Sequence, residues 1–205
     1  MGKTPLFITG IGTGIGKTIV SAVLVEKLKA DYWKPVQSGD LDNSDTLLVK
    51  SLVSNPVTKF YPEAYRLTQP FSPHKSAALD GIEIDPEKII IPQTDNQLII
   101  EGAGGLMVPL NERFLMIDLI KKLSAEVVLV SQNYLGSINH TLLSIDALRS
   151  RNIPMKGIIF NGDSDEWSES VIRKQAGSSI VFFNIPPLTG IDKDNITACA
   201  EKIML

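Results

Sequence analysis

The chain has 205 residues, of which 43% are hydrophobic and 21% are charged, a balance that predicts one globular domain over residues 1–205. The formal net charge of −3 offers no basic surface for nucleic acid, so we expect no nucleic-acid partner. Neither an apolar leader nor a run near the ~20 apolar residues of a membrane span stands out, and Cys199 is the only cysteine. We therefore expect a cytoplasmic protein without disulfides or membrane contact.

Short apolar runs alternate along the chain with amphipathic patterns. The runs that predict strands are Leu6–Thr9, Gln97–Glu101, Val127–Ser131, Gly157–Asn161 and Ile180–Phe183. The patterns that predict helices are Thr18–Ala30, Thr46–Leu52, Met116–Leu123, Ser137–Arg151, Trp167–Gln175 and Lys193–Ile203. This alternation predicts an α/β fold, a doubly wound and mainly parallel sheet with helices on both faces. Ligands of such folds bind beyond the carboxyl ends of the strands.

Two segments are less regular. Residues 33–39 read WKPVQSG and combine a lysine, a rigid proline and small residues, which we interpret as a surface turn. Residues 55–92 contain six prolines and predict an irregular excursion over the site. A lysine in a surface turn is usually just solvated, so the importance of Lys34 depends on what the chain brings beside it.

Residues 10–18 read GIGTGIGKT, between the first strand and the first helix. Glycines let backbone N–H groups curl around an anion, and a lysine at the start of the helix reaches the outer phosphates of a nucleotide. The sequence therefore predicts a phosphate loop of the P-loop type that binds a mononucleotide, with one residue more between Gly10 and Gly16 than the usual loop has. The residues expected to hold the nucleotide are Gly12, Thr13, Gly14, Ile15, Gly16, Lys17, Thr18 and Ile19.

Two carboxylates are candidates for holding Mg²⁺ next to this loop. Glu101 ends an apolar strand, where a carboxylate is costly unless it is paired or binds a metal, and a run of small residues over 102–105 follows it. Asp45 has two readings, because the stretch DNSDT also looks like an N-cap for the helix Thr46–Leu52. Thr18 would add its hydroxyl to the metal site.

Four blocks occur in order, GIGTGIGKT, WKPVQSG with DNSDT, EGAGGLMVPL and NYLGSINHTLLSIDALR. Together they resemble the dethiobiotin synthetase family, from the first strand to about Pro187, and the family's phosphate loop carries the same extra residue. The resemblance implies a homodimer and an ATP- and Mg²⁺-dependent ring closure. In that reaction 7,8-diaminononanoate and CO₂ give a carbamate, ATP phosphorylates it, and the second amine closes the ring to dethiobiotin, ADP and phosphate.

The resemblance also implies roles for single residues. The implied catalytic residues are Lys34, Lys17, Thr13 and Ser38, and the implied Mg²⁺ ligands are Thr18, Asp45 and Glu101. The backbone of Gly102, Ala103 and Gly104 would meet phosphates or substrate, and Asn161 and Pro186 would hold the nucleotide base. Gly136, Ser137, Ile138 and Asn139 open a helix and would bind the substrate's carboxylate tail near the dimer interface, or else serve only for capping and interface packing.

The segment Thr189–Leu205 is shorter than in longer family members, so we expect looser recognition of the base. Three alternatives compete with this interpretation. A partitioning or septum-site switch ATPase would carry a second lysine early in the phosphate loop, where this chain has Gly12. An amidotransferase-coupled ligase would need a glutaminase domain with its cysteine, and a pure binding module would leave Lys34, Asp45 and Glu101 without a shared purpose.

Overall fold

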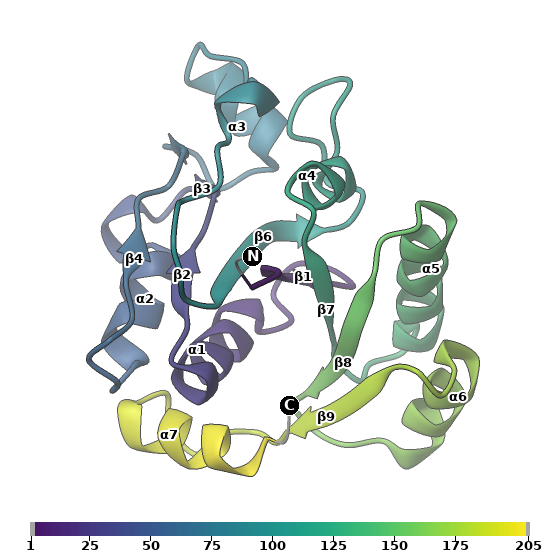
Figure 1. The fold of residues 1–205 in the computed structure, drawn as a ribbon. Coiled ribbons are helices and arrows are strands. Elements are labelled where there is room, and N and C mark those ends of the chain that lie inside the picture. Colours follow the sequence, from purple (N-terminus) through teal and green to yellow (C-terminus); the bar gives the residue numbers. More distant parts are fainter. Residues whose placement is uncertain (1–2, 204–205) are drawn as a thin grey trace.

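A computed structural model describes residues 3–203 and is built on a seven-stranded sheet in the order β4-β2-β6-β1-β7-β8-β9 (Figure 1). Every neighbouring pair in this sheet runs parallel. Its strands are β1 (Leu6–Gly10), β2 (Asp31–Trp33), β4 (Phe60–Tyr61), β6 (Leu98–Gly105), β7 (Glu126–Ser131), β8 (Met155–Asn161) and β9 (Val181–Ile185). A small parallel pair, β3 (Val36–Ser38) with β5 (Tyr65–Leu67), lies beside it. The doubly wound parallel fold is confirmed.

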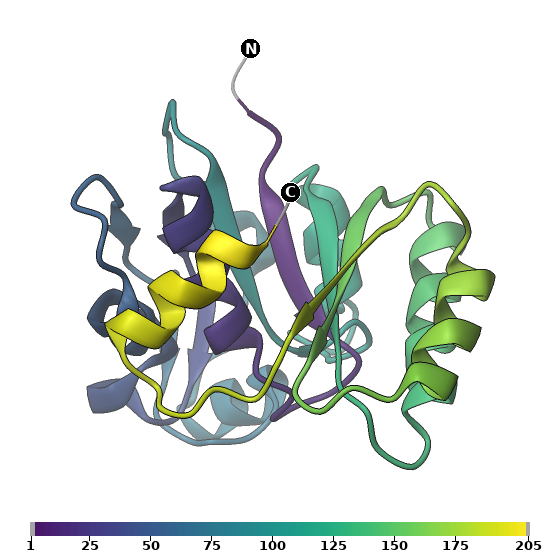
Figure 2. The same ribbon diagram turned by 90° about the horizontal axis from the view of Figure 1, so that it is seen from below.

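Helices cover both faces of the sheet (Figures 1 and 2). One face carries α1 (Lys17–Leu28), α2 (Asp45–Leu52) and α7 (Lys193–Lys202), and the other carries α4 (Met116–Lys122), α5 (Ser137–Ser150) and α6 (Glu166–Ala176). The short helix α3 (Pro73–Leu79) and two 3₁₀ turns, Leu41–Asn43 and Pro86–Lys88, complete the fold. Among residues 3–203 no helix has both the length and the apolarity needed to cross a membrane.

Each face of the sheet has its own apolar core, because successive residues of a strand point to opposite sides. In β1, Leu6 and Ile8 pack with α1 and α7, whereas Phe7 packs with α4, α5 and α6. Both sets are buried, which explains why the strands read as continuous apolar runs. In the sheet β1 lies between β6 and β7, so the loop after β1 opens at the point where the strand order reverses, the usual ligand site of such folds.

The interpretation of residues 33–39 as a surface turn is wrong. Lys34 is only 4% exposed, and Trp33, Val36 and Gln37 are buried as well. The segment links β2 to β3, and β2 is a strand of the main sheet that the sequence reading missed. Three residues are too few to show a periodic pattern, and this strand begins with a charged residue, Asp31, whose carboxylate accepts hydrogen bonds from the Lys59 amide and from Thr94.

The excursion over residues 55–92 is more regular than predicted. It contributes β4 to the edge of the main sheet, β5 to the small pair, and α3. These elements have only two to seven residues each, too short to give a period that could be recognised among six prolines. Residues 1–2 and 204–205, which belong to the predicted domain and to the predicted C-terminal tail, lie outside the described residues.

Candidate active site

The predicted phosphate loop lies between the end of β1 and the start of α1. Gly14 and Gly16 adopt φ values of +75° and +83°, in the left-handed region that glycine tolerates. A Cβ atom at Gly16 would overlap the side-chain amide of Asn161, which reaches the loop from the end of β8 and donates to the Ile15 carbonyl at 3.0 Å. The residue predicted to hold the base therefore supports the phosphate loop directly.

Lys17, the loop lysine, is 8% exposed and its Nζ donates to the carbonyl of Gly12 at 3.0 Å. Burial is the largest influence on the pKa of Lys17 and lowers it, the charge of Glu101 opposes this shift, and the smaller effects of Lys34 and Asp45 lower and raise it respectively. The net result is a pKa lowered from 10.5 to about 8. Lys17 is therefore a cation near neutral pH that is close to losing its proton.

This shift predicts a pH-dependent nucleotide affinity. Bound phosphates favour the ammonium form, so as pH rises above about 8 the free protein must first take up a proton, and affinity should fall by up to about tenfold per pH unit. The free energy of unfolding should instead rise between about pH 8 and pH 10.5. In that range the folded protein has lost the Lys17 proton while the unfolded chain still keeps it, so a rise in pH favours the folded state. Titration with a non-hydrolysable ATP analogue between pH 7 and 9.5 measures the effect. Equal affinity across that range, or the same decline in Lys17→Met, would contradict it.

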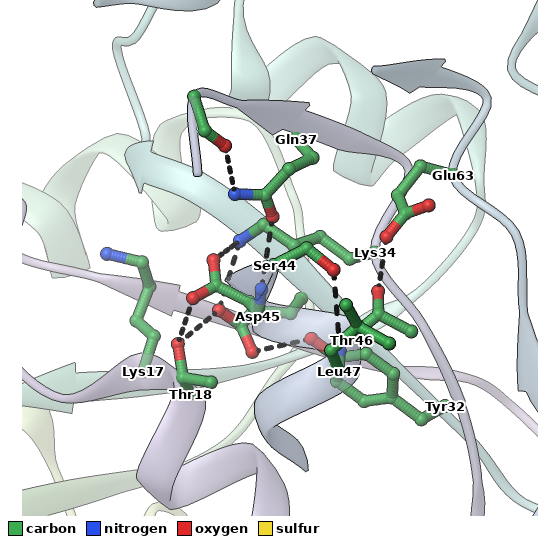
Figure 3. A network of polar contacts seen from close by, with 12 residues as sticks. Lys17, Thr18, Tyr32, Lys34, Gln37, Ser44, Asp45, Thr46, Leu47 and Glu63 are labelled. Atoms are coloured by element: carbon green, nitrogen blue, oxygen red, sulfur yellow. Dashed lines mark hydrogen bonds and ion pairs between the residues drawn. The ribbon is translucent and has the colours of Figure 1, made fainter. Parts of the chain in front are cut away.

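Four side chains from different parts of the chain converge beside the loop, and Figure 3 labels three of them, Thr18, Lys34 and Asp45. The ammonium of Lys34, just after β2, lies 2.7 Å from Asp45 Oδ2 and 3.1 Å from Glu101 Oε1. The hydroxyl of Thr18, in the first turn of α1, lies 3.1 Å from Asp45 Oδ1 and 2.9 Å from Glu101 Oε1. The side chains of Lys34 and Glu101 are 5% and 1% exposed, whereas Asp45 is 33% exposed. The sequence prediction that Lys34, Asp45 and Glu101 act together thus has a geometric basis.

The geometry at the start of α2 decides whether Asp45 caps this helix or belongs to the site. Ser44 is the N-cap residue, and its hydroxyl accepts from the Leu47 amide, while Asp45 is the first helical residue. The Asp45 carboxylate turns instead towards Lys34 and Thr18. Burial, the largest single influence, raises the pKa of Asp45. The charge of Lys34, the hydrogen bonds from Lys34 and Thr18 and the charge of Lys17 together outweigh burial and hold that pKa below its usual value. Asp45 is therefore an anion of the site, and Ser44 caps the helix.

The ionisation of Lys34 follows from the same contacts. Burial lowers its pKa, but the negative charges of Glu101 and Asp45 and the hydrogen bonds to them raise it above the usual value. A cation enclosed by two carboxylates keeps its proton throughout the physiological range. Lys34 is therefore suited to stabilise negative charge in the cleft, and not to act as a base.

The oxygen set of Thr18, Asp45 and Glu101 suits Mg²⁺. A hard cation of this size takes carboxylate, hydroxyl, phosphate and water oxygens, and it is usually held by one or two carboxylates together with nucleotide phosphates. The hydroxyl of Thr18 meets one oxygen of each carboxylate within 3.1 Å. No cluster of three or more His, Cys, Asp or Glu side chains able to hold a metal occurs within residues 3–203, so a metal here would depend on the hydroxyl and the nucleotide as well.

A cleft of about 690 Å³ opens above these residues. The predicted residues that line it are Thr13, Gly14, Gly16, Lys17, Thr18, Ile19, Lys34, Ser38, Asp45, Glu101, Ala103 and Gly104. The lining residues that the sequence reading missed are Gln37, Leu48, Pro70, Phe71, Ser72, Pro73, Val108 and Ile191. Gln37 lay within the WKPVQSG block, Val108 lay within the EGAGGLMVPL block, and residues 70–73 lay in the predicted excursion. Leu48 and Ile191 gave no signal.

Ser38 and Thr13 both line this cleft. The Oγ of Ser38 is buried and has no hydrogen-bond partner within the described residues, although the side chain lines the cleft. A buried hydroxyl without a partner costs free energy that a bound polar group can recover. Gly104 has φ +69°, and a Cβ there would overlap the Val108 side chain and lie 3.5 Å from Thr13 Oγ1, so glycine keeps the wall beside Thr13 open.

Several predicted residues lie away from the cleft. Gly136, Ile138 and Asn139 line a separate hollow of about 790 Å³ at the start of α5, where Ser137 is buried. Pro186 borders a cavity of about 180 Å³ against α7. Gly102 lies in β6, where a Cβ would overlap the ring of Phe7, so it serves packing. Within one chain, the predicted phosphate-loop residues and carboxylates therefore line the same cleft. The predicted substrate-tail residues lie elsewhere.

Comparison with known proteins identifies the family. The profile of an AAA domain family matches residues 4–195. The dethiobiotin synthetase BioD of Christiangramia forsetii is 55% identical over 175 residues, covering 85% of this chain and 84% of the relative. That of Cytophaga hutchinsonii is 48% identical, over 96% of this chain and 95% of the relative. The chain belongs to the dethiobiotin synthetase family. Members of this family are ATP-dependent ligases, so the chain is an enzyme of that class.

Solved structures outside the family share its fold. A ParA family ATPase from Chlorobium tepidum superposes with a TM-score of 0.59 at 15% identity, over 98% of both chains. MinD in the MinC:MinD complex of Aquifex aeolicus gives 0.59 at 14% identity, over 96% of this chain and 86% of that one. These likenesses confirm the P-loop NTPase architecture. They do not support the alternative function of a switch ATPase, because these two structures are only 14–15% identical to this chain, whereas the dethiobiotin synthetase relatives are 48–55% identical.

Proposed function

We propose that this chain catalyses the ATP-dependent closure of a cyclic urea from 7,8-diaminononanoate and CO₂, giving dethiobiotin, ADP and phosphate. The observation that carries the proposal is the position of Lys34, a buried cation at the wall of the phosphate-loop cleft, held by Asp45 and Glu101. Relatives named ATP-dependent dethiobiotin synthetase, 46–55% identical over most of the chain, support the same reaction.

Three steps account for the residues in the cleft. One amine of the substrate adds to CO₂ and loses a proton, which leaves a carbamate anion. A carbamate oxygen then attacks the γ-phosphorus of ATP, ADP leaves, and a carbamic-phosphoric anhydride forms. The second amine attacks the carbamate carbon, phosphate leaves with the C–O bond electrons, the attacking nitrogen loses a proton, and the urea ring closes. Two anions must meet in the second step, so catalysis depends mostly on positioning and on neutralising charge.

Two cations line the cleft and come from different parts of the chain. Lys17 opens α1 and belongs to the phosphate loop, whereas Lys34 projects from the end of β2 (Figure 3). We propose that Lys17 binds the outer phosphates and that Lys34 faces the carbamate and the transferring phosphoryl group, with Ser38 and Thr13 hydrogen-bonding the carbamate. Thr18, Asp45 and Glu101 would hold Mg²⁺, which supplies further neutralisation of phosphate charge when bound.

We also propose a homodimer in which Gly136, Ser137, Ile138 and Asn139 bind the carboxylate tail of the substrate in the partner's cleft. The support is geometric: these residues start α5, where the positive end of the helix dipole favours an anion, and Gly136, Ile138 and Asn139 border a different hollow from the phosphate loop of their own chain. Light scattering should give twice the chain mass of 22.4 kDa. A monomer that is fully active would contradict the proposal.

The reaction is tested by a phosphate-release assay with the diamine, bicarbonate and MgATP. We expect phosphate release to require the diamine and bicarbonate together. ATP turnover that is independent of the diamine would overturn the proposed function and favour a switch ATPase or another ligase.

Recognition of the nucleotide base should be permissive. Two residues are predicted to hold the base. Asn161 supports the phosphate loop, whereas Pro186 borders a small cavity against α7. We therefore expect detectable turnover with GTP or CTP, measured as kcat/KM in the same assay. Discrimination in favour of ATP by more than ~100-fold, which corresponds to roughly 2.7 kcal/mol, would contradict this expectation.

A further inference from the structure

Tyr32 is a buried polar residue that the proposed chemistry does not use. It lies in the middle of β2 and is 0% exposed, in the apolar core beneath α1 that also contains Ile8 and Ile99. Its ring packs against that of Phe60, with centroids 6.0 Å apart. The hydroxyl at the end of the ring donates a hydrogen bond to Glu101 Oε2 at 2.9 Å.

The two oxygens of Glu101 therefore have different partners. Oε2 accepts from Tyr32, whereas Oε1 accepts from Thr18 at 2.9 Å and from Lys34 at 3.1 Å. Oε2 faces the core and Oε1 faces the groups that border the cleft. Because each oxygen has its own partners, the carboxylate cannot rotate about its Cγ–Cδ bond without losing hydrogen bonds.

The strand register explains how a core tyrosine reaches a site carboxylate. In the parallel pair of β2 and β6, Tyr32 lies opposite Ile99. Glu101 is two residues further along β6, so its side chain emerges on the same face of the sheet as Ile99 and Tyr32. The length of the phenol ring spans the remaining distance, which a shorter polar side chain at this position would not.

We infer that Tyr32 is a positioning residue, which holds Glu101 so that a single carboxylate oxygen is presented to a divalent cation bound between Thr18 and Asp45. The inference rests on the proposed function, because that function assigns the cation to these ligands. Tyr32 touches neither nucleotide nor substrate in this account and acts only through Glu101.

Removal of the hydroxyl alone should weaken the metal site. In Tyr32→Phe the ring and its packing remain, but Oε2 loses its partner in the core and the carboxylate can rotate. Loss of the partner that orients a ligand typically lowers metal affinity 10–100-fold. We expect the Mg²⁺ concentration for half-maximal activity to rise by about tenfold or more, with kcat at saturating Mg²⁺ and KM for the diamine both within about threefold of the wild type.

The matched control is Tyr61→Phe. Tyr61 lies on the neighbouring strand β4, and its hydroxyl donates to Asp31 Oδ2 at 3.2 Å, away from the cleft. Both variants lose one phenol hydroxyl that donates to a carboxylate. Only Tyr32→Phe should change the metal site.

The decisive measurement is calorimetric titration of Mn²⁺ into the protein saturated with a non-hydrolysable ATP analogue. We expect about tenfold or weaker binding for Tyr32→Phe, unchanged binding for Tyr61→Phe, and equal metal-free affinity for the analogue in all three proteins. Unchanged Mn²⁺ affinity in Tyr32→Phe would overturn the inference, as would a loss of kcat that Mg²⁺ does not restore. A wild-type protein that binds Mn²⁺ but does not turn over the diamine would refute the proposed function while leaving the inference intact.

Discussion

Replacing Lys34 with methionine should lower kcat by about 10²–10³-fold while changing nucleotide affinity by less than about threefold. Methionine keeps the length and apolar volume of the side chain but removes the charge that we assign to the carbamate and the transferring phosphoryl group. A single group that stabilises developing charge typically contributes this much to the rate. Nucleotide binding should survive, because the phosphate contacts belong to the loop and to Lys17.

Lys17→Met is the matched control for this prediction. Both lysines are nearly buried, 4% and 8% exposed, and both belong to the cleft, so a general loss of cleft charge would affect the two variants alike. We expect Lys17→Met to lose nucleotide affinity and Lys34→Met to lose turnover. Abolished nucleotide binding in Lys34→Met would show that Lys34 belongs to the phosphate site and that the division of roles is wrong.

Replacing Glu101 with glutamine should have the largest effect on stability. Glu101 is 1% exposed and accepts hydrogen bonds from Thr18, Tyr32 and Lys34. The isosteric amide keeps the shape but removes the negative charge beside a buried ammonium, and breaking a buried ion pair in this way costs about 3 kcal/mol or more. For a chain of this size we expect the Tm to fall by roughly 6–12 °C in a thermal unfolding scan.

Asp45→Asn provides the comparison, because it removes the other negative charge next to Lys34. The Asp45 side chain is 33% exposed, so water screens its charge and can solvate the amide that replaces it. The expected loss of Tm is therefore clearly smaller than for Glu101→Gln. Equal losses in the two variants would show that burial of Glu101 is not what makes it important for the fold.

The parts of the fold that could be predicted are those in which one local stretch determines its own structure. The run from Leu6 to Thr9 is apolar on both faces and could only be a buried strand, and GIGTGIGKT specifies a phosphate loop by residue type and spacing. Glu101 could be singled out because a carboxylate at the end of an apolar strand is costly without a partner. All three interpretations agree with the structure.

The parts that could not be predicted depend on contacts between distant segments. β2 is a strand because it inserts between β4 and β6, and the burial of Lys34 follows from that insertion. Tyr32 and Glu101 are 69 positions apart in sequence, and their contact depends on the register between β2 and β6. Asp45 could not be assigned from DNSDT alone, because the choice between cap and ligand depends on where Lys34 lies.

The central claim, that the cleft uses ATP to join CO₂ to a vicinal diamine, is tested most directly with labelled bicarbonate. The enzyme is incubated with MgATP, the diamine and ¹⁴C-bicarbonate, and acid-stable label is counted against phosphate released. The account predicts one acid-stable label per phosphate, because a closed urea survives acid whereas a free carbamate does not. In Lys34→Met it predicts that the rates of label incorporation and phosphate release both fall by about 10²–10³-fold. Phosphate released without incorporation of label, or label fixed without ATP, would contradict it.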